Sequence, residues 1–408
     1  MLVLGALLPL RGRALVGIRR HLPNWPIVDI TSDPFRGDGR LLDHVLAGSV
    51  SDPGEALAAV QDYERRTGRR PAAAVPLSEL TVDSAYAIAE FFDLPRLPDP
   101  RLARDKLAMK EALRRHGLPV ADYRLVTDLD SLEAGARAFG YPLVLKVNAL
   151  GGSEGVQFID APEELATAYE RGQSALRRQS EVFPGYPGHL LLEPYSGLPE
   201  CSVEVLNSSG RRVVLSVTDK SITLLPNFAE TGQAIPGCRW NDALLRERAC
   251  EACRALRIDV GIAHVEFRGE YVGEVAARTP GDAILDQFER ATGLNAYAWH
   301  AAAYLGDIEC LPEIPPTRGT SAIAFLKARA GRIRGIHLPE RLPEEVVRME
   351  IFTQIGRRSS QPYNNHVREG LVEMWWPDRP PGQEPIHEHV ALAMQLSDAI
   401  FDVEEDAS

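Results

Sequence analysis

The sequence predicts a mixed fold, α/β in its first hundred residues and α+β beyond them, and three observations indicate it. Residues 1–100 alternate short apolar runs with helical patterns, which is typical of a parallel sheet covered by helices. From Val120, short strand and helix patterns describe a small α+β unit, and strand patterns dominate from Cys201. With 408 residues, the chain is long enough for two or three domains.

The first unit is expected to contain strands at residues 2–10, 26–30 and 72–76, and helices at 14–21, 54–67 and 83–92. Its first apolar run is shorter than the roughly 20 residues that span a bilayer, and it lacks the basic start and cleavage site of a signal peptide. We therefore expect a buried strand there. A proline cluster at 95–100 closes the unit, and a helix from about Arg101 to Arg115 follows, ended by Gly117 and Pro119.

The rest of the chain is expected to be rich in strands. In the small α+β unit we predict strands at 123–126, 143–147, 156–159 and 190–193, and helices at 131–139 and from 160 past 171. Strands at 201–206, 212–217 and from 221, a helix at 243–256 and a hairpin at 264–278 follow. Strands at 321–328 and 332–336 begin a last strand-rich segment, and the acidic tail 402–408 is expected to be frayed.

Composition argues against some classes of partner. The formal net charge of −12 argues against a nucleic-acid-binding surface, because such a surface needs clustered Lys and Arg. No apolar run is long enough to cross a membrane. The five cysteines lack the spacing of a disulfide framework, so a reducing cytoplasm fits. Cys250 and Cys253 share the apolar face of a helix, and we interpret them as core residues rather than zinc ligands.

The hairpin at 264–278 carries two carboxylates. A three-residue loop centred on Glu270 would set Glu266 opposite Glu274, with β-carbons about 5 Å apart. Like charges at that separation are destabilising unless a cation neutralises them, and oxygen ligands suit Mg²⁺ better than zinc. The alternative is an exposed hairpin with solvated charges.

A glycine-rich loop follows the strand that ends at Lys146. The loop residues Gly151, Gly152, Ser153, Gly155 and Val156 precede another strand. Because glycines have no β-carbon, backbone N–H groups can approach phosphate oxygens there, and the lysine can neutralise them. The spacing is not that of a P-loop, and an ordinary glycine hairpin is the alternative.

The order of these motifs resembles the ATP-grasp superfamily, and within it the carboxylate–amine ligases typified by bacterial L-amino acid ligases. The resemblance covers most of residues 75–310. It implies an ATP-grasp fold with a Rossmann-like domain at 1–104 and an ATP-grasp domain at 105–310. The latter would contain a lid subdomain at about 118–192, and a C-terminal α+β segment at 311–408 would complete the core.

The resemblance also implies roles for individual residues. Those expected to bind ATP are Lys106, Lys146, Gly151, Gly152, Ser153, Gly155, Val156, Glu193, Pro194 and Tyr195, with Glu200 on the ribose. Glu266 and Glu274 would hold the metal, and Arg278 would be the catalytic residue that stabilises the transferring phosphoryl group. The residues expected near the substrates are Glu230, Gly232, His264, Arg278, Gly281 and Asp282.

Two departures and two open roles accompany the resemblance. Ala276 stands where many members of the superfamily have a metal-binding Asn, and Gly-Leu-Pro-Glu200 replaces the commoner Gly-x-Glu. His264 could equally be a structural, hydrogen-bonded histidine. Asp282 could hold an acceptor amine or cap a helix. The Trp375–Trp376 pair is interpreted as core or interface.

The expected function is ATP-dependent formation of an amide or peptide bond through an acyl phosphate, with release of ADP and phosphate. ATP and Mg²⁺ are the expected cofactors, with Mn²⁺ as a substitute. The expected partners are small carboxylates and amines, without nucleic acid or membrane, in the cytoplasm, and a homodimer is left open. Two alternatives remain: an ATP-grasp carboxylase of the kind that acts on biotin or an aminoimidazole, and a non-catalytic nucleotide-binding module.

Overall fold

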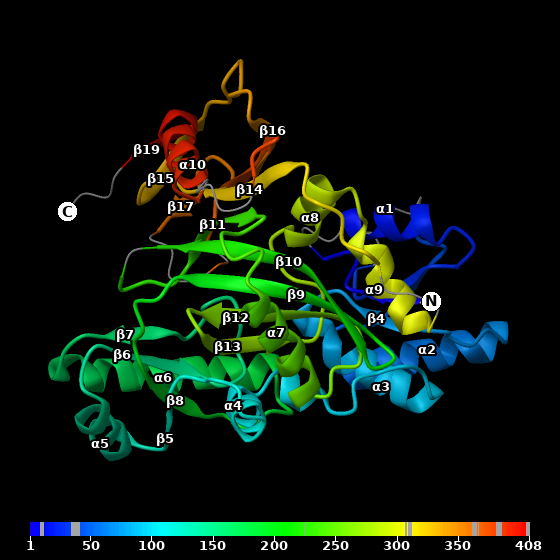
Figure 1. Ribbon diagram of the computed structural model, residues 1–408, viewed down its shortest axis with the longest axis horizontal. Coiled ribbons are helices and arrows are strands. Elements are labelled where there is room, and N and C mark those ends of the chain that lie inside the picture. The colour runs from blue at the N-terminus through cyan, green and yellow to red at the C-terminus, as the bar shows by residue number, and fades with distance from the viewer. Residues whose placement is uncertain are drawn as a thin grey trace.

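The computed structural model describes residues 1–8, 12–33, 41–223, 225–306, 308, 312–360, 365, 367–380 and 386–404. The strands of this part of the chain form four sheets. In Figure 1 the N-terminal sheet lies at the right, the predicted lid (about 118–192, called the lid below) with its helix α6 at the lower left, and the C-terminal strands at the top. The largest sheet runs between them.

The N-terminal sheet is parallel, as predicted, and has the order β3-β2-β1-β4. Its strands are β1 (Leu2–Leu4), β2 (Val28–Thr31), β3 (His44–Ala47) and β4 (Ala74–Pro76), and its helices are α1 (Gly12–His21), α2 (Pro53–Thr67) and α3 (Val82–Phe92). Strand β3 was not predicted. Strand β1 is shorter than expected because Gly5 turns the chain at a φ of +84°, and the buried carboxylate of Asp29 accepts hydrogen bonds from the N–H groups of Gly5 and Leu7.

The lid has a four-stranded antiparallel sheet and a hydrophobic core of its own. Its strands are β5 (Arg124–Val126), β6 (Leu143–Val147), β7 (Gln157–Ile159) and β8 (Leu190–Pro194), and its helices are α5 (Leu129–Phe139) and α6 (Leu165–Val182). Asp128 caps α5 by accepting from the N–H of Ser131. All these elements agree with the prediction. Helix α4 (Lys106–Arg115) leads into the lid and is capped by Asp105.

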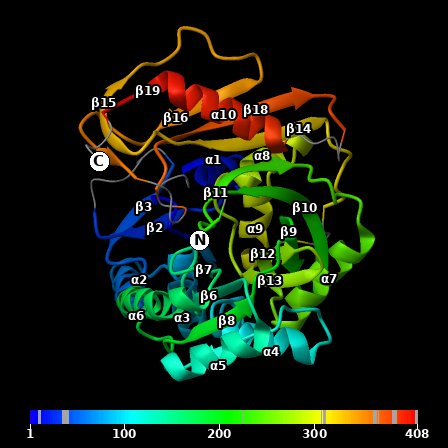
Figure 2. The same ribbon diagram turned by 90° about the vertical axis from the view of Figure 1, so that its left-hand side faces the viewer.

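The central sheet has eight strands in the order β13-β12-β9-β10-β11-β14-β18-β16. They are β9 (Glu200–Ser208), β10 (Arg211–Ile222), β11 (Glu230–Ile235), β12 (Val260–Arg268), β13 (Tyr271–Ala276), β14 (Gly319–Leu326), β16 (Val346–Ile351) and β18 (Gly370–Pro377). The strand expected from 221 is wrong, since β10 continues to Ile222 and the next strand begins at Glu230. Three C-terminal strands complete the sheet, and Figure 2 shows them beneath α10.

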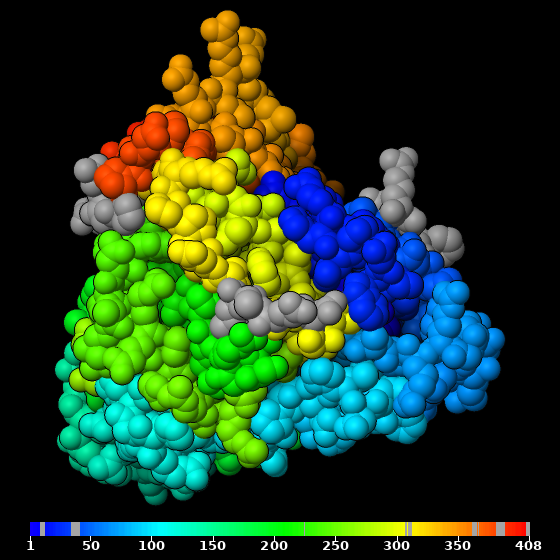
Figure 3. Space-filling model, turned by 45° about the vertical axis from the view of Figure 1, so that its right-hand side comes forward, coloured from blue at the N-terminus to red at the C-terminus, as the bar shows by residue number. Residues whose placement is uncertain are grey.

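Three helices beyond the hairpin were not predicted: α8 (Ile284–Thr292), α9 (Ala296–Leu305) and α10 (Ile386–Ile400). Helix α9 is buried on nearly all sides, so its sequence lacks the polar face that identifies an amphipathic helix. It packs against α1, and Figure 3 shows this yellow part of the chain beside the blue N-terminal segment. The N-terminal unit and the central sheet therefore share one large core.

A small sheet in the order β17-β15-β19 lies near the C-terminus, with β15 (Gly331–Ile336), β17 (Arg358–Ser359) and β19 (Phe401–Glu404). The expected fraying is therefore wrong for residues 402–404, while 405–408 lie outside the described residues. Trp375 packs against the main core and Trp376 against the C-terminal core, which supports a packing role.

The four cysteines that the structure describes form no disulfide. Cys253 is buried in helix α7 (Ala243–Ala255) and is a free thiol, like Cys201, Cys238 and Cys250, whereas Cys310 lies outside the described residues. No helix in the described ranges is long and apolar enough to cross a bilayer.

Candidate functional site

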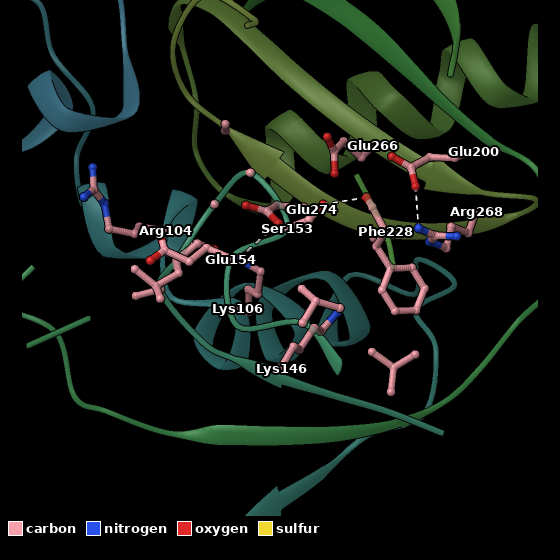
Figure 4. Close-up of a pocket in the computed structure, with 18 of the residues that line it drawn as sticks. Arg104, Lys106, Lys146, Ser153, Glu154, Glu200, Phe228, Glu266, Arg268 and Glu274 are labelled. Atoms are coloured by element: carbon pink, nitrogen blue, oxygen red, sulfur yellow. Dashed lines mark hydrogen bonds and ion pairs between the residues drawn. The ribbon is translucent and has the colours of Figure 1, made fainter. Parts of the chain in front are cut away.

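A cavity of about 460 Å³ lies between the lid and the central sheet, and the N-terminal unit contributes to its wall. Figure 4 shows its acidic side chains on the strands of the central sheet and Lys106 and Lys146 across from them. The predicted residues that line it are Lys106, Lys146, Gly151, Gly152, Ser153, Val156, Glu193, Pro194, Tyr195, Glu200, Glu230, His264, Glu266, Glu274 and Arg278. Gly155, Gly232, Gly281 and Asp282 are not among its lining residues.

The glycine loop closes one side of the cavity and is fastened to the body of the protein. The hydroxyl of Ser153 donates to the carbonyl oxygen of Phe228 at 2.8 Å, and the N–H of Asn365 donates to the carbonyl of Gly152 at 3.0 Å. Gly155 has a φ of +74°, and a β-carbon there would lie 2.9 Å from that of Ala175 in α6. Its role in the structure is close packing of the loop on α6.

Two lysines share one buried carboxylate at the lid strands. Glu193 lies 2.8 Å from the Nζ of Lys146 and 3.1 Å from the Nζ of Lys110. Burial alone would raise the pKa of Glu193, but the two ammonium groups lower it below its usual range. Burial, reinforced by Lys146, lowers the pKa of Lys110 to about 8. Sequence reasoning missed Lys110, although its spacing of four from Lys106 places both on one face of α4.

The hairpin sets Glu266 directly opposite Glu274, as predicted. The predicted three-residue loop is wrong, because Arg268 pairs with Tyr271 and only Gly269 and Glu270 form the turn. The pairing shifts between Glu266 and Phe267, so Gly273 has no register partner, and this irregularity restores the expected alignment.

Each of these two carboxylates already has a lysine partner. The Nζ of Lys106 lies 3.1 Å from Glu274, and the Nζ of Lys220 lies 2.5 Å from Glu266. Lys220 also contacts Glu230 at 2.9 Å and Glu200 at 3.6 Å. These three acidic residues, Glu200, Glu230 and Glu266, each offer a carboxylate oxygen within 4.8 Å of the others. The oxygen-only donors suit Mg²⁺, while Lys220 supplies the neutralising charge in this structure.

Lys220 was missed by sequence reasoning, and a signal for it existed. Ser216, Thr218 and Lys220 alternate along β10 with residues of the opposite face, so they point to the same side. The hydroxyls of Ser216 and Thr218 donate to the buried Glu204. Polar residues at a period of two on a long strand therefore marked an inward polar face.

His264 lies between two carboxylates. Its Nδ1 is 2.8 Å from Glu204 and its Nε2 is 3.1 Å from Glu266. Burial and the nearby Lys220 would lower the pKa of His264, but hydrogen bonds to the two glutamates raise it above its usual value. In this geometry His264 fixes the orientation of Glu266 at the cavity wall.

Arg278 is held by the N-terminal unit. Its Nε donates to the carboxylate of Glu79 at 3.0 Å, and its Nη1 donates to the carbonyl of Thr279. Arg104 contacts the same carboxylate at 3.4 Å. Burial would raise the pKa of Glu79, but the two guanidinium groups lower it. No local pattern in the sequence marks Glu79, because only folding brings it to the hairpin.

The remaining predicted substrate residues divide into two groups. Glu230 lines the cavity and accepts from Lys220 and from Gln233 at 2.7 Å. Asp282 instead pairs with Arg368 at 2.9 Å. The helix-capping alternative for Asp282 is wrong, because Ala283 is the N-cap of α8 and no side chain caps it.

Glu200 and an aromatic group form the other end of the cavity. Glu200 pairs with Arg268 at 2.5 Å, and Figure 4 shows this pair beside the ring of Phe228. Burial raises the pKa of Glu200 against the influence of Arg268 and Lys220. Phe228 lies 6.2 Å from Tyr195 between ring centroids, and Tyr195 lies 5.2 Å from Phe158. The rings of Tyr195 and Phe228 thus give this end of the cavity an apolar wall.

Comparison with known proteins finds similarity to the ATP-grasp domain and to two ligases. A family described as the ATP-grasp domain matches residues 139–301. The chain is 25% identical over 243 residues to the L-arginine-specific L-amino acid ligase of Bacillus subtilis, which is 56% of each protein. It is 41% identical over 69 residues to a D-alanine–D-alanine ligase of Geobacter sulfurreducens, which is 17% of this chain and 22% of that one. The chain thus spans about half or less of these relatives' lengths.

The overall fold is also similar to a solved structure. The L-amino acid ligase from Bacillus licheniformis superposes with a TM-score of 0.80 at 22% sequence identity, over 100% of this chain and 98% of that one. The lid, the glycine loop and the carboxylate hairpin lie in the region that the family match covers or directly beside it. Residues 139–301 thus match the ATP-grasp domain, and the fold of the whole chain is similar to that of an L-amino acid ligase.

Proposed function

We propose that this protein is an ATP-dependent carboxylate–amine ligase that joins amino acids or similar small molecules and releases ADP and phosphate. One observation carries the proposal: a single cavity gathers Lys146 of the lid, Lys106 and Lys110 of α4, two opposed carboxylates of a hairpin and Arg278. These groups suit, in turn, a polyphosphate, a divalent cation and a transferring phosphoryl group. The similarity to two amino acid ligases supports amino acids as substrates.

The nucleotide would lie between the lid and the central sheet. Lys146 and Lys110 offer ammonium groups to its phosphates, and the loop from Gly151 offers backbone N–H groups. The aromatic wall of Tyr195 and Phe228 suits a purine ring. We assign the binding of the ribose hydroxyls to the carboxylate of Glu200. This carboxylate has a raised pKa and pairs with Arg268, so it would exchange that partner when it binds the ribose.

Glu266 and Glu274 would hold Mg²⁺, and their oxygen donors fit that ion. Bound there, the cation would supply charge neutralisation for the phosphates. Ala276, register partner of His264, offers no side-chain ligand, so water and phosphate oxygens would complete the coordination. In this structure Lys106 pairs with Glu274 and Lys220 pairs with Glu266, and the two ammonium groups balance the charges of these carboxylates.

The reaction would run in two steps. A carboxylate oxygen of the first substrate attacks the γ-phosphorus of ATP, the bond to the bridging oxygen breaks, and ADP leaves. The nitrogen of the neutral amine then attacks the acyl carbon, the bond from that carbon to the phosphate oxygen breaks, and phosphate leaves while the amine loses a proton. Both steps concentrate negative charge on oxygen, so positioned cations dominate catalysis. Arg278 would place its planar fork on those oxygens.

Two other functions stay in view. A carboxylase of the same superfamily would use the same phosphate chemistry with bicarbonate in place of the first carboxylate. A nucleotide-binding module would use the cavity without turnover. The presence of Arg278 and both opposed carboxylates at one cavity supports an enzyme over a module.

The proposal is tested by measuring ADP release with Mg²⁺-ATP and pairs drawn from the twenty amino acids. We expect a subset of pairs to give ADP and phosphate in equal amounts, with an amide product visible by mass spectrometry. ADP release that requires bicarbonate and not an amine would support the carboxylase instead. ATP binding without ADP release under all these conditions would support the module.

A further inference from the structure

The lid touches the N-terminal unit beside the cavity. The hydroxyl of Tyr186, in the loop between α6 and β8, donates to the carboxylate of Asp83 in α3 at 2.7 Å. Phe183 of the same loop lines the cavity. This contact joins two parts of the chain that are 103 residues apart.

Arg104 lies directly behind this contact and is almost wholly buried. Its guanidinium carbon is 4.0 Å from the ring centroid of Phe183 and 5.1 Å from that of Tyr186. Its Nε and Nη1 are buried without a hydrogen-bond partner among the described residues, although Nη1 lies 3.6 Å from Asp83. A buried cation is costly without compensation, and the two aromatic faces provide it together with the carboxylates of Glu79 and Asp83. The position of Arg104 therefore depends in part on the lid loop.

Glu79 connects Arg104 to the reactive end of the cavity. The Nη2 of Arg104 donates to the backbone carbonyl of Glu79 and lies 3.4 Å from its carboxylate. The other carboxylate oxygen accepts from the Nε of Arg278 at 3.0 Å. Tyr186, Arg104, Glu79 and Arg278 thus form a continuous row from the lid to the residue assigned to phosphoryl transfer.

We propose that Glu79 and Arg104 are positioning residues for Arg278, and that the Tyr186–Asp83 hydrogen bond couples this positioning to the closed lid. The inference rests on the proposed ligase function. With the lid closed, the rings fix Arg104, Arg104 fixes Glu79, and Glu79 turns the fork of Arg278. With the lid open, Arg104 loses its aromatic faces and water reaches the acyl phosphate. Closure of the lid and orientation of the Arg278 side chain then occur together.

The test measures coupling, defined as amide formed per ADP released. Tyr186→Phe keeps the ring over Arg104 and removes only the hydroxyl. We expect ADP release without an amine to rise about tenfold, because a hydrogen bond to a carboxylate shifts the closed–open equilibrium by that order. Amide formed per ADP should fall accordingly. Tyr169→Phe is the matched control, since among the described residues the Tyr169 hydroxyl donates only to the carbonyl oxygen of Thr127 within the lid, at 3.4 Å.

Asp83→Asn and the double variant, Tyr186→Phe with Asp83→Asn, complete a double-mutant cycle. The double variant should uncouple no more than the stronger single variant, because both remove the same bond. Glu79→Gln should lower the rate of amide formation about tenfold and leave the affinity for ATP unchanged, as expected of a group that acts through Arg278. Equal losses of ADP and amide in Tyr186→Phe, with the ratio unchanged, would reduce the contact to a structural one and overturn the proposal.

A measurement without turnover separates this inference from the proposed function. Amide hydrogen exchange in residues 183–190 should be faster in Tyr186→Phe than in the wild type and in Tyr169→Phe, with ATP bound. If Tyr186→Phe exchanged faster than the wild type but the wild type joined no substrates, the role of the Tyr186–Asp83 hydrogen bond in lid closure would stand and the ligase assignment would fail. If the wild type joined substrates, and Tyr186→Phe had the same hydrogen exchange and the same amide formed per ADP as the wild type, only the proposal on the Tyr186–Asp83 hydrogen bond would fail.

Discussion

The ammonium of Lys220 lies 2.5 Å from a carboxylate oxygen of Glu266. The opposed glutamates of the hairpin are therefore not left to repel one another, since this residue and Lys106 neutralise them before any ligand enters. Burial would lower the pKa of Lys220, but the surrounding glutamates raise it well above its ordinary value, so the ammonium stays charged. The structure thus carries its own cation beside the expected metal position.

Lys220→Met should destabilise the protein by about 3–5 kcal/mol, because it leaves three partly buried carboxylates without their shared, buried cation. Mg²⁺ should restore part of that loss by binding between them. Urea unfolding with and without Mg²⁺ measures both effects. Lys327→Met is the control, since Lys327 pairs with Glu369 at 3.1 Å away from the cavity, and its loss should not respond to Mg²⁺. An equal response of both variants would contradict the prediction.

Glu274→Ala should lower ADP release at least about a hundredfold, because the transferring charge loses a ligand of its cation. The fold should persist, as circular dichroism can show, since the Glu274 side chain is 31% exposed. Glu270→Ala, at the hairpin turn, removes an acidic group that pairs only with Arg239 and Arg248 in the described structure and should retain activity. Turnover near the wild-type rate in Glu274→Ala would mean that the metal assignment is wrong.

ATP affinity should fall as pH rises through about 8, the pKa of the buried Lys110, because the ammonium that faces the phosphates is then lost. Titrations of ATP binding between about pH 6.5 and 9.5 would check this. In Lys110→Arg the charge persists over that range and the dependence should disappear. A pH profile shared by both proteins would assign the effect to another group.

The same shift has the opposite sign for stability. Lys110 has a lower pKa in the folded chain than its ordinary 10.5, so between about pH 8 and 10.5 the unfolded chain holds a proton that the folded chain has released. Its contribution to the free energy of unfolding therefore increases with pH across that window. Denaturation at about pH 8 and 10, compared with Lys110→Met, isolates this contribution; a difference that stays constant would contradict it.

Gly232→Ala should destabilise the protein by about 1–3 kcal/mol. A β-carbon there would lie 2.6 Å from the Nε2 of the buried His389 and 2.9 Å from the carbonyl oxygen of Ile323. Gly281→Ala is the matched control, because a β-carbon added at Gly281 would meet nothing within 4 Å. Thermal unfolding should separate the two variants. If Gly281→Ala instead raised the KM for a substrate while Gly232→Ala left stability unchanged, the packing explanation would be wrong.

Much of the fold followed from local patterns. The alternation of strands and helices in residues 1–100 predicted the parallel sheet, and the lid elements from β5 to β8 were placed correctly, because their apolar periods are regular and their ends carry residues such as Asp128 and Gly140. Helix α9 could not be found in this way. Its burial on nearly all sides removes the polar face that makes a helix visible in sequence.

The sequence by itself determined the glycine loop, Lys146 and the alignment of Glu266 with Glu274, because each depends on neighbours within one strand pair or turn. Only the tertiary structure decided which charged groups lie beside them. Lys110 and Glu79 line the cavity from a helix and from another unit of the fold, Lys220 contacts its glutamates from a distant strand, and Asp282 pairs with Arg368 instead. Charges that lie far apart along the chain meet only when the chain packs, so no local pattern could assign these pairs.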